Sequence, residues 1–565
     1  MGDENENLFH EKDIEVEVVI EEKRYPGKLS FDGTRFPKLQ LRNLYSPKGL
    51  VFLECLKGKS ELTCISLKDK RKYTMSGVND NDTFFSAKYI TEGEPLVTFD
   101  KMTINISGFS VWLEGMENYS LNPDSIEKNT KSSILTERFS SQGENYTLSI
   151  YLKRGNQGND AENEGAGSEP ALEIIKEQGC LNFKECSFLS HQLRNLFSIL
   201  TGRPLSVKNV WVSDTKIPDS FRKLHFPLVM YSKSPLKHPN EALTEFAYLL
   251  RRDILSKAIN NFFTDDNFRK IWNRIIPSYE QLGVWQYDIL SRVIILEMYA
   301  SIKTKEKKLS ISDSLNRKLK EKLKQSIMEF ESETGIKGEE LIVLRGMERS
   351  ILATKNTSLP TLKEKYEELL RILPSTLIGV ISISDEDFKR IKKLRDSIAH
   401  GNPYSTYSGD IDITHEIQLN DRLLVLLICF VYFELGFNEN DIIHFFRYSF
   451  CHFINSSGIN KRELDRLSGE VDFLKLSSPP KNNALSSPAM IVVNHTIDND
   501  KWFINEEATQ KLRTEWFTSG IHHSQEYVES ITPAKQNQTF ELKQRAYIET
   551  DGQEKEYYIV VIIHS

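Results

Sequence analysis

The sequence predicts an α+β protein of several domains: a β-rich N-terminal region with antiparallel sheets, then an all-α domain, then a small α/β C-terminal segment. Three observations predict this class. The chain has 565 residues, more than one compact core holds. The spacing of apolar residues changes from alternating to helical near residue 241. The polar stretch SSPPKNNALSSP then separates a last segment. We expect domains at 1–235, 241–467 and 489–565.

The first domain is rich in short runs of β-branched and aromatic residues, bounded by Gly, Asn, Asp and Pro. These runs predict antiparallel sheets, arranged as a sandwich or a distorted barrel. A single helix is expected at 186–202, ending at Gly202, and a strand follows at 204–213. The candidate strands before that helix are IEVEVVIE (14–21), GLVFLECL (49–56), ELTCISL (61–67), MTINIS (102–107), SVWLE (110–114) and YTLSIYL (146–152).

The second domain carries apolar residues at helical spacing in four long segments. These segments are ALTEFAYLLRRDIL, VWQYDILSRVIILEMYASI, ELIVLRGMERSIL and RLLVLLICFVYFELG. The longest apolar run, 423–433, is too short to span a bilayer and ends at Glu434, so we expect a buried helix and no membrane partner. In the last segment, AMIVVNHT and EYYIVVIIH predict strands and NEEATQKLRTEWF predicts a helix.

The composition is that of an ordinary folded protein, with 39% hydrophobic and 27% charged residues. The net charge of −7 argues against a generally basic nucleic-acid coat, although a local basic groove is compatible with it. Six cysteines without a CxxC pair predict reduced thiols, and the acidic N-terminus lacks the apolar core of a secretion signal. We therefore expect a cytoplasmic protein.

The stretch LRDSIAHG, residues 394–401, ends a helix with clear start and stop signals. Ser384 is a suitable N-cap, with Asp387 three positions on as the capping-box partner. Gly401 fits the position after the helix, and Pro403 forbids its continuation. His400 is therefore expected in the last turn.

Arg395 is unusual because a helical wheel places it inside the apolar arc formed by Phe388, Ile391, Leu394 and Ile398. A guanidinium does not leave water without partners, so Arg395 either extends to solvent, pairs with an acid, or lines a protein interface. Asp396 and His400 are four positions apart, so the carboxylate can orient the imidazole. The alternative is an ordinary surface ion pair, which stabilises little.

The spacing of an arginine and a histidine decides nothing by itself. FFRYSFCHF contains a second such pair, Arg447 and His452, and one chance match is expected in a chain with twelve histidines. Tyr448 follows the second arginine, and the surrounding residues are aromatic. We interpret Arg447 and His452 as residues that pack helices together.

Other patterns compete weakly for a functional role. Asp410, Asp412, His415 and Glu416 offer cation ligands, but acidic residues are also favoured at a helix N-terminus. NDND at 79–82 lacks the spaced ligands and the glycine of an EF-hand loop. HExxH, Walker A, GxGxxG and GxSxG motifs do not occur. The sequence therefore predicts neither a metal site nor a cofactor.

LRDSIAHG resembles the signature of HEPN ribonucleases, in which arginine, a polar residue and three further residues precede histidine. Arg395, Asp396 and His400 match it, whereas Tyr448 departs from the pattern at its polar position. The order of segments from about residue 10 to 455 resembles that of ApeA-like abortive-infection proteins. These proteins place a β-rich domain before a HEPN domain, and FDGTRFPKLQLRNL and FLSHQLRNLFSILTGRPLSVKNVWV carry the N-terminal part of the resemblance.

The resemblance implies a metal-independent endoribonuclease of an anti-phage system. The 2′-hydroxyl of RNA attacks the adjacent phosphorus and leaves a 2′,3′-cyclic phosphate. His400 would be the general base or acid, Arg395 would hold the scissile phosphate, and Asp396 would orient His400. The implied substrate is tRNA, cut in the anticodon loop, and no cofactor is implied.

Arg395 and His400 lie roughly 140° apart around one helix, so a single copy makes a poor site. The resemblance implies a homodimer in which two copies complete one cleft. The order of the domains leads to the further hypothesis that the N-terminal domain senses a phage-derived activator or restrains the nuclease. The alternative is a non-catalytic HEPN dimer that binds RNA or a partner protein.

RNA binding requires basic surface, and two stretches provide it. Residues 303–324 hold nine Lys or Arg against three acids, and FKRIKKLR lies beside the motif. A solvated helix face explains both stretches equally well. The candidate RNA contacts are Lys389, Arg390, Lys392, Lys393, Arg317 and Lys318.

Overall fold

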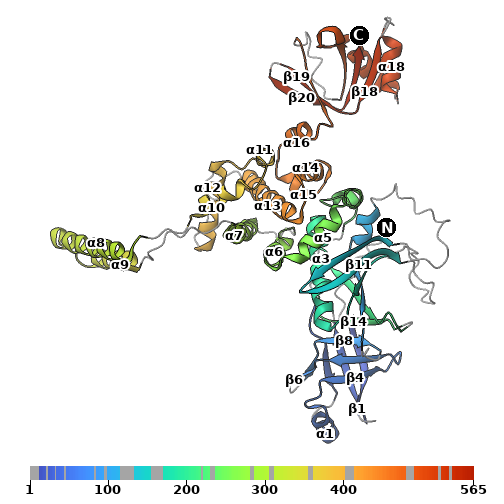
Figure 1. Ribbon diagram of the computed structural model, residues 1–565, viewed down its shortest axis with the longest axis vertical. Helices are drawn as coiled ribbons and strands as arrows, with labels where there is room; N and C mark the ends of the chain where they lie inside the picture. The colour runs from blue at the N-terminus through green and yellow to red at the C-terminus, as the bar shows by residue number, and fades with distance from the viewer. Residues whose placement is uncertain are drawn as a thin grey trace. The chain divides into compact units, whose positions relative to one another are not determined.

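The structure is a computed structural model whose chain divides into two compact units, described separately below. The first comprises residues 1–438 and 448–458, and the second comprises 439–447 and 459–565. The structure describes residues 12–20, 23–31, 34–42, 46–81, 84–93, 98–114, 133–153, 169–217, 220–228, 236–279, 285–303, 311–353, 360–400, 413–478, 489–519, 523–532, 538–550 and 552–565. Figure 1 shows the chain coloured from its N-terminus to its C-terminus.

The N-terminal region forms one sheet of fourteen described strands, in the order β10-β11-β12-β9-β13-β14-β8-β5-β4-β1-β2-β3-β7-β6. Described neighbours pair antiparallel, as in the nine-residue β1–β2 register from Lys12 opposite Phe31 to Ile20 opposite Lys23. This confirms the predicted β-rich region with antiparallel pairing. The strands are β1 (Lys12–Ile20), β2 (Lys23–Phe31), β3 (Lys38–Leu41), β4 (Glu61–Ser66), β5 (Lys72–Ser76), β6 (Asn79–Asn81), β7 (Phe84–Ser86), β8 (Tyr89–Glu92), β9 (Lys101–Ile106), β10 (Ser133–Ser141), β11 (Glu144–Lys153), β12 (Glu169–Lys176), β13 (Val207–Ser213) and β14 (Arg222–His225).

Two of the predicted strands are helices, and both predictions are wrong. GLVFLECL lies in α1 (Pro47–Leu56), where the Ser46 hydroxyl caps the helix by accepting from the Gly49 amide at 3.0 Å. SVWLE lies in α2 (Phe109–Glu114). In α1, Phe52 and Leu56 are four positions apart and both enter the core of the sheet. The apolar residues on both sides of Phe52 concealed this helical spacing in the sequence.

The helix predicted at 186–202 is α3 (Phe183–Thr201), which begins three residues earlier than expected. Asn182 and Glu185 form a reciprocal capping box at its start. Gly202 ends it in the left-handed conformation, with a φ of 62°, as predicted. A methyl group at Gly202 would also lie 2.9 Å from the Leu243 side chain, so both conformation and space favour glycine there.

The middle of the chain is helical, as predicted from the apolar spacing. The helices are α4 (Phe246–Arg251), α5 (Ile254–Thr264), α6 (Asp266–Trp272), α7 (Trp285–Lys303), α8 (Asp313–Thr334), α9 (Glu339–Ala353), α10 (Leu362–Leu370), α11 (Ser375–Ile381), α12 (Asp385–Ala399), α13 (Ile413–Leu435), α14 (Glu439–Tyr448), α15 (His452–Ser456) and α16 (Lys461–Ser468), with 3-10 turns at Pro239–Glu241 and Ile276–Tyr279.

Helix α13 is the centre of this helical region. Every side chain from Leu423 to Tyr432 is buried, and α13 contacts α5, α7, α11 and α15. This confirms the buried helix predicted from the run 423–433. Among the helices of the described residues, none is long and apolar enough to cross a membrane.

Besides α14 and α16, the described part of the second unit contains two small sheets and two further helices, α17 and α18. Its sheets run in the orders β15-β19-β20 and β17-β16-β21-β18, and β16 and β21 are parallel neighbours at the centre of the second sheet. One face of that sheet shares a core with β15 and β19, and the other packs on the two helices. The elements are β15 (Asp472–Lys475), β16 (Met490–Thr496), β17 (Lys501–Ile504), α17 (Glu506–Ser519), α18 (Ser524–Ile531), β18 (Thr539–Lys543), β19 (Ala546–Thr550), β20 (Gln553–Tyr557) and β21 (Ile559–His564), with a 3-10 turn at Ile497–Asn499.

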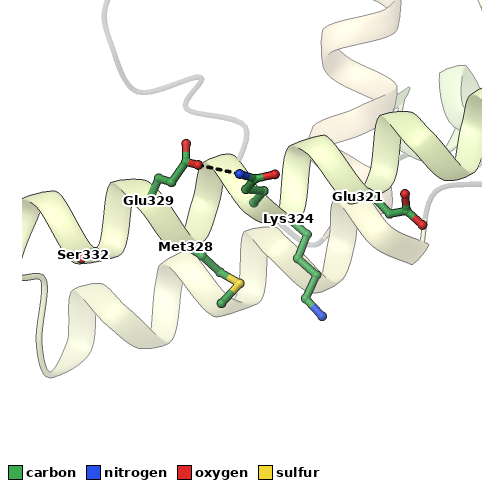
Figure 2. Close-up of a pocket in the computed structure, with 6 residues that line it drawn as sticks. Glu321, Lys324, Met328, Glu329 and Ser332 are labelled. Carbon is green, nitrogen blue, oxygen red and sulfur yellow. Dashed lines mark hydrogen bonds between the residues drawn. The ribbon is translucent and has the colours of Figure 1, made fainter.

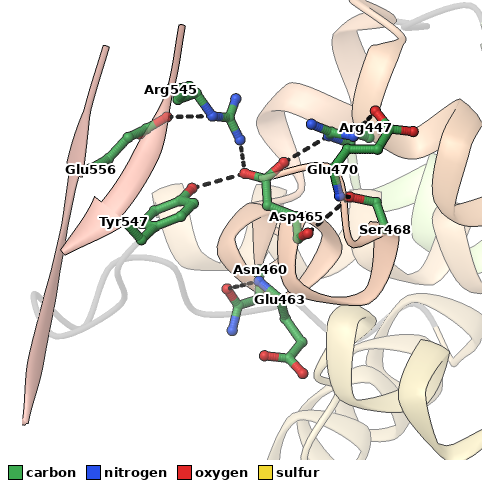
Figure 3. A network of polar contacts seen from close by, with 9 residues as sticks. All are labelled: Arg447, Asn460, Glu463, Asp465, Ser468, Glu470, Arg545, Tyr547 and Glu556. Atoms are coloured by element: carbon green, nitrogen blue, oxygen red, sulfur yellow. Dashed lines mark hydrogen bonds and ion pairs between the residues drawn. The ribbon is translucent and has the colours of Figure 1, made fainter. Parts of the chain in front are cut away.

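A buried carboxylate joins three elements of this second unit (Figure 3). Asp465 of α16, whose side chain is 1% exposed, accepts hydrogen bonds from Arg447 Nε at 2.8 Å and from the Tyr547 hydroxyl at 2.9 Å. Arg545 also contacts it. A buried carboxylate is stable only with such partners, so Asp465 fixes α14, α16 and β19 to one another.

Candidate ribonuclease site

Helix α12 presents the motif, and its start is the one that the sequence predicts. The Ser384 hydroxyl accepts from the Asp387 amide at 3.1 Å, and Asp387 accepts from the Ser384 amide at 3.0 Å. Burial opposes ionisation of Asp387, but hydrogen bonds from Ser384 and from His415 outweigh it and hold its pKa below the usual value. The capping box is therefore confirmed.

The apolar face of α12 packs against α7, and this orients the rest of the helix. Phe388, Ile391 and Leu394 are buried, which confirms the predicted arc. Phe388 also stacks on Tyr366 of α10 with ring centroids 4.0 Å apart. Because three side chains one turn apart are held in the core, the helix has one rotational setting, and that setting places Arg395 at the edge of the core.

Arg395 is bound by two carboxylates. Its Nη2 donates to both oxygens of Glu297 on α7, at 2.9 and 3.2 Å, and its Nη1 donates to Asp396 at 2.8 Å. The hydrogen bond to Asp396 and the charge of Glu297 raise the pKa of Arg395, although partial burial opposes this. Of the three settings that the sequence allowed for Arg395, the pairing with an acid is the one in this structure, and the side chain is 31% exposed.

His400 is the C-cap of α12, and its side chain is exposed. Its amide donates to the Asp396 carbonyl at 3.0 Å, which places the imidazole at the end of the helix. Within the described part of the chain, the Asp396 carboxylate contacts Arg395, and no hydrogen bond joins it to the His400 imidazole. Gly401 and Pro403, the predicted stop signals, lie outside the described residues.

Sequence reasoning missed Glu297. It interrupts the apolar run VIILEMYA of α7, and a lone acid in such a run is a signal that it has a buried partner. That signal does not identify the basic residue that pairs with Glu297, because Glu297 and Arg395 are 98 positions apart in the chain. Only the packing of α7 on α12 makes them neighbours.

Of the four competing cation ligands, the structure describes His415 and Glu416. His415 of α13 contacts Asp387 through Nε2 at 3.3 Å, and Glu416 is buried in the first turn of that helix. This confirms the interpretation of Glu416 as an acid near a helix N-terminus. Asp410 and Asp412 lie outside the described residues, as does Asp82 of NDND. Among the residues that the structure describes, no three His, Cys, Asp or Glu side chains form a metal-binding group.

The second arginine–histidine pair differs from the first. Arg447 belongs to α14 and donates to Asp465, whereas His452 begins a separate helix, α15. Arg447 is 11% exposed, so its guanidinium is committed to a carboxylate within the protein. The two residues do not project from one continuous helix, as Arg395 and His400 do.

The six candidate RNA contacts are all exposed: Lys389, Arg390, Lys392 and Lys393 on α12, and Arg317 and Lys318 on α8. The surface of α8 is not uniformly basic. A groove along this helix, of about 390 Å³, is lined by Glu321, Lys324, Gln325, Met328, Glu329 and Ser332 (Figure 2). Its charges are mixed, so the groove itself favours no polyanion.

The N-terminal sheet carries a more basic pocket. It has a volume of about 470 Å³ and lies between β2 and α1, over the stacked rings of Tyr25 and Phe52. The lining residues are Lys23, Arg24, Tyr25, Pro47, Lys48, Val51, Phe52 and Cys55. Three cations around an aromatic and apolar floor favour an acidic ligand with an apolar part.

Two family models match the chain. The model described as ApeA N-terminal domain 1 matches residues 15–264, and the model described as Apea-like HEPN matches residues 290–441. No curated protein and no solved structure matches. The first match covers the antiparallel sheet together with α3 to α5, and the second covers α7 to α13 with the motif of α12. The chain therefore belongs to the ApeA-like HEPN family of abortive-infection proteins.

Proposed function

We propose that this protein is a metal-independent endoribonuclease that acts in the cytoplasm against phage infection. The observation that carries the proposal is that Arg395 lies in the last turns of α12 and His400 is exposed at its C-terminal end, in a domain of the HEPN family. Histidine titrates near neutral pH and can move a proton, and arginine supplies a fixed positive charge that matches a phosphate.

The proposed reaction is attack of a ribose 2′-oxygen on the adjacent phosphorus. His400 removes the 2′-hydroxyl proton or protonates the 5′-oxygen that leaves, and the products carry a 2′,3′-cyclic phosphate and a 5′-hydroxyl. Arg395 stabilises the added negative charge on the phosphoryl oxygens. The guanidinium of Arg395 has five N–H donors. It makes three hydrogen bonds to Glu297 and Asp396.

A second copy of the chain would complete the site. Arg395 and His400 project about 140° apart from one helix. A single phosphate therefore cannot easily contact both side chains of the same subunit. A two-fold axis near the end of α12 places each Arg395 beside the partner's His400. We therefore propose a homodimer with a shared cleft.

The proposed substrate is tRNA, cut in the anticodon loop, because an unpaired loop exposes its backbone and bases. The proposed contacts to RNA are Lys389, Arg390, Lys392, Lys393, Arg317 and Lys318.

The N-terminal domain is proposed to sense a phage-derived activator. An acidic activator would bind in the basic pocket between β2 and α1.

The second candidate function is a non-catalytic HEPN dimer that binds RNA or a protein. The observation in its favour is the pairing of Arg395 with Glu297, because an arginine held by two carboxylates can be a structural residue. The two functions differ in one measurable respect, which is whether RNA is cut.

The test is incubation of the purified protein with total tRNA, with and without extract from phage-infected cells, in the presence of EDTA. We expect cleavage with 2′,3′-cyclic ends by the wild type, and loss of at least a hundredfold in Arg395→Ala and His400→Ala, since general acid–base catalysis contributes about that much. His452→Ala is the matched control and should cleave normally. If the tRNA stays equally intact with the wild type and both variants under all conditions, the proposal of an enzyme is wrong. The non-catalytic binding function would then be supported.

A further inference from the structure

Two histidines face each other in the second unit, outside the region that the family models match. His495 on β16 and His564 on β21 are direct register partners in the parallel pair at the centre of the sheet. Their Nδ1 atoms lie 3.0 Å apart, and their side chains are 15% and 22% exposed. The chain end is fixed beside them, because the Ser565 amide donates to the His495 carbonyl at 2.9 Å.

The other nitrogen of each ring is held by a carboxylate. His495 Nε2 lies 3.0 Å from Asp500, and His564 Nε2 lies 3.3 Å from Glu541 of β18. A nitrogen that faces a carboxylate must carry a proton to make this bond. The two Nδ1 atoms that face each other are then the ring nitrogens left to coordinate an ion.

We propose that His495 and His564 form a two-histidine binding site for a divalent transition-metal ion of the Cu²⁺, Ni²⁺ and Zn²⁺ class. The ion lies between the two Nδ1 atoms, both of which become ligands, and any proton held there leaves to solvent. Imidazole suits these three ions. Metal-binding histidines almost always donate their other N–H to a carboxylate, a backbone carbonyl or water, and here Asp500 and Glu541 already occupy those positions.

The spacing of the two nitrogens suits such an ion. With metal–nitrogen bonds of about 2.0 Å, two ligands at a right angle lie about 2.8 Å apart and two tetrahedral ligands about 3.3 Å apart. The observed 3.0 Å falls between these values, so the rings must tilt toward a common point but need not separate far. Asp500 and Glu541 are 83% and 45% exposed, so they can follow the rings.

The position in the fold also suits a ligand. His495 and His564 lie at the carboxyl ends of the two parallel strands, the edge at which ligands bind in open α/β sheets. On the same face, Ile491, Val493, Val560 and Ile562 continue the two strands into the core. With only two protein ligands, the ion keeps coordination positions for water.

Trp502 provides a local probe. Its ring stacks on His495 with centroids 3.9 Å apart and an interplanar angle of 9°, so bound Cu²⁺ would quench its fluorescence. The experiment titrates Cu²⁺ into tag-free, EDTA-treated full-length protein. We expect saturable quenching that Trp502→Phe loses. His495→Ala and His564→Ala should weaken binding at least tenfold, and Asp500→Asn about 10- to 100-fold while keeping both imidazoles.

The control is His523→Ala, which removes an exposed histidine of the same unit and should leave the titration unchanged. Electron paramagnetic resonance of bound Cu²⁺ should show two imidazole nitrogens. The proposal fails if His564→Ala binds Cu²⁺ as tightly as wild type, if Trp502→Phe is quenched as much as wild type, or if the spectrum shows one imidazole. Cleavage of tRNA is not the readout, so this result is independent of the function proposed for Arg395 and His400.

Discussion

At the scale of single residues, Arg395 lies in a negatively charged setting. One guanidinium is held by two carboxylates, Glu297 and Asp396, so the three groups together are negative. A phosphate approaching Arg395 must compete with Glu297 for Nη2. We therefore expect the proposed site to bind RNA poorly in this state.

Glu297→Gln should therefore increase cleavage of tRNA without any activator. The amide keeps the size of the side chain and loses the charge that competes with phosphate. One charge-assisted hydrogen bond is worth about 1.5 kcal/mol, so we expect a gain on the order of tenfold in the rate at low RNA concentration. Glu367→Gln, at an exposed acid on α10, is the control and should change nothing. Cleavage by Glu297→Gln as weak as that by Arg395→Ala would instead make Glu297 a positioning residue.

At the scale of elements, α12 connects the capping box at its N-terminal end to the proposed site at its C-terminal end. The capping box of Ser384 and Asp387 fixes the start of the helix, and the buried Phe388, Ile391 and Leu394 fix its rotation. His400 is the last residue with helical contacts, so fraying of the helix would move the imidazole directly. A change at the N-cap is thus transmitted through one rigid element to the proposed site.

Removing the cap should loosen α12 measurably. Ser384→Ala is expected to cost about 1 kcal/mol, which corresponds to roughly fivefold faster amide hydrogen exchange in residues 385–399. Ser397→Ala, inside the same helix, is the control and should leave exchange nearly unchanged. Equal exchange in Ser384→Ala and wild type would show that packing alone holds the helix.

The same cap predicts a pH dependence. The pKa of Asp387 is lowered in the folded chain, so its carboxylate stabilises α12 at pH values above the ordinary carboxyl pKa of about 4. This contribution is lost as the pH falls through the lowered pKa. The difference in hydrogen exchange between wild type and Asp387→Asn should therefore be large at neutral pH and shrink below pH 4. If the difference in hydrogen exchange stays constant as the pH falls, the effect of Asp387 comes from the shape of its side chain and not from its charge.

At the scale of the whole molecule, the family matches cover the sheet and the helical region, and neither extends past residue 441. The proposed site uses only the helical region, and the proposed activator pocket lies in the sheet. The second unit holds the buried Asp465 network and the two-histidine site. The proposed activity, the proposed sensing and the proposed metal binding thus belong to three separate parts of the chain.

A shared cleft between two subunits has a distinctive consequence. Arg395→Ala and His400→Ala should each be inactive alone, because each homodimer lacks one of the two groups in its cleft. Unfolding and refolding the two variants together should form mixed dimers that contain one Arg395 and one His400, and a substantial fraction of tRNA cleavage should return. A mixture as inactive as its components would mean that each subunit carries its own complete site.

The sequence by itself determined the order of the three regions, the helix around the motif and its capping box. These features follow from the spacing of apolar residues and from side chains that satisfy the backbone a few positions away, so a local stretch of chain is enough to determine them. GLVFLECL and SVWLE show the limit of this reasoning. Runs of five to eight mostly apolar residues are compatible with either a strand or a helix. In α1 and α2, contacts with the rest of the fold favoured the helical conformation.

Only the tertiary structure decided the partners of the charged groups. Glu297 meets Arg395 across 98 positions, Asp465 meets Tyr547 across 82, and His495 meets His564 across 69. Each pair is brought together by the packing of helices or the pairing of strands that are distant in the chain. A helical wheel showed that Arg395 needed a partner, but the identity of that partner depends on which helix packs against it, and no local pattern contains that information.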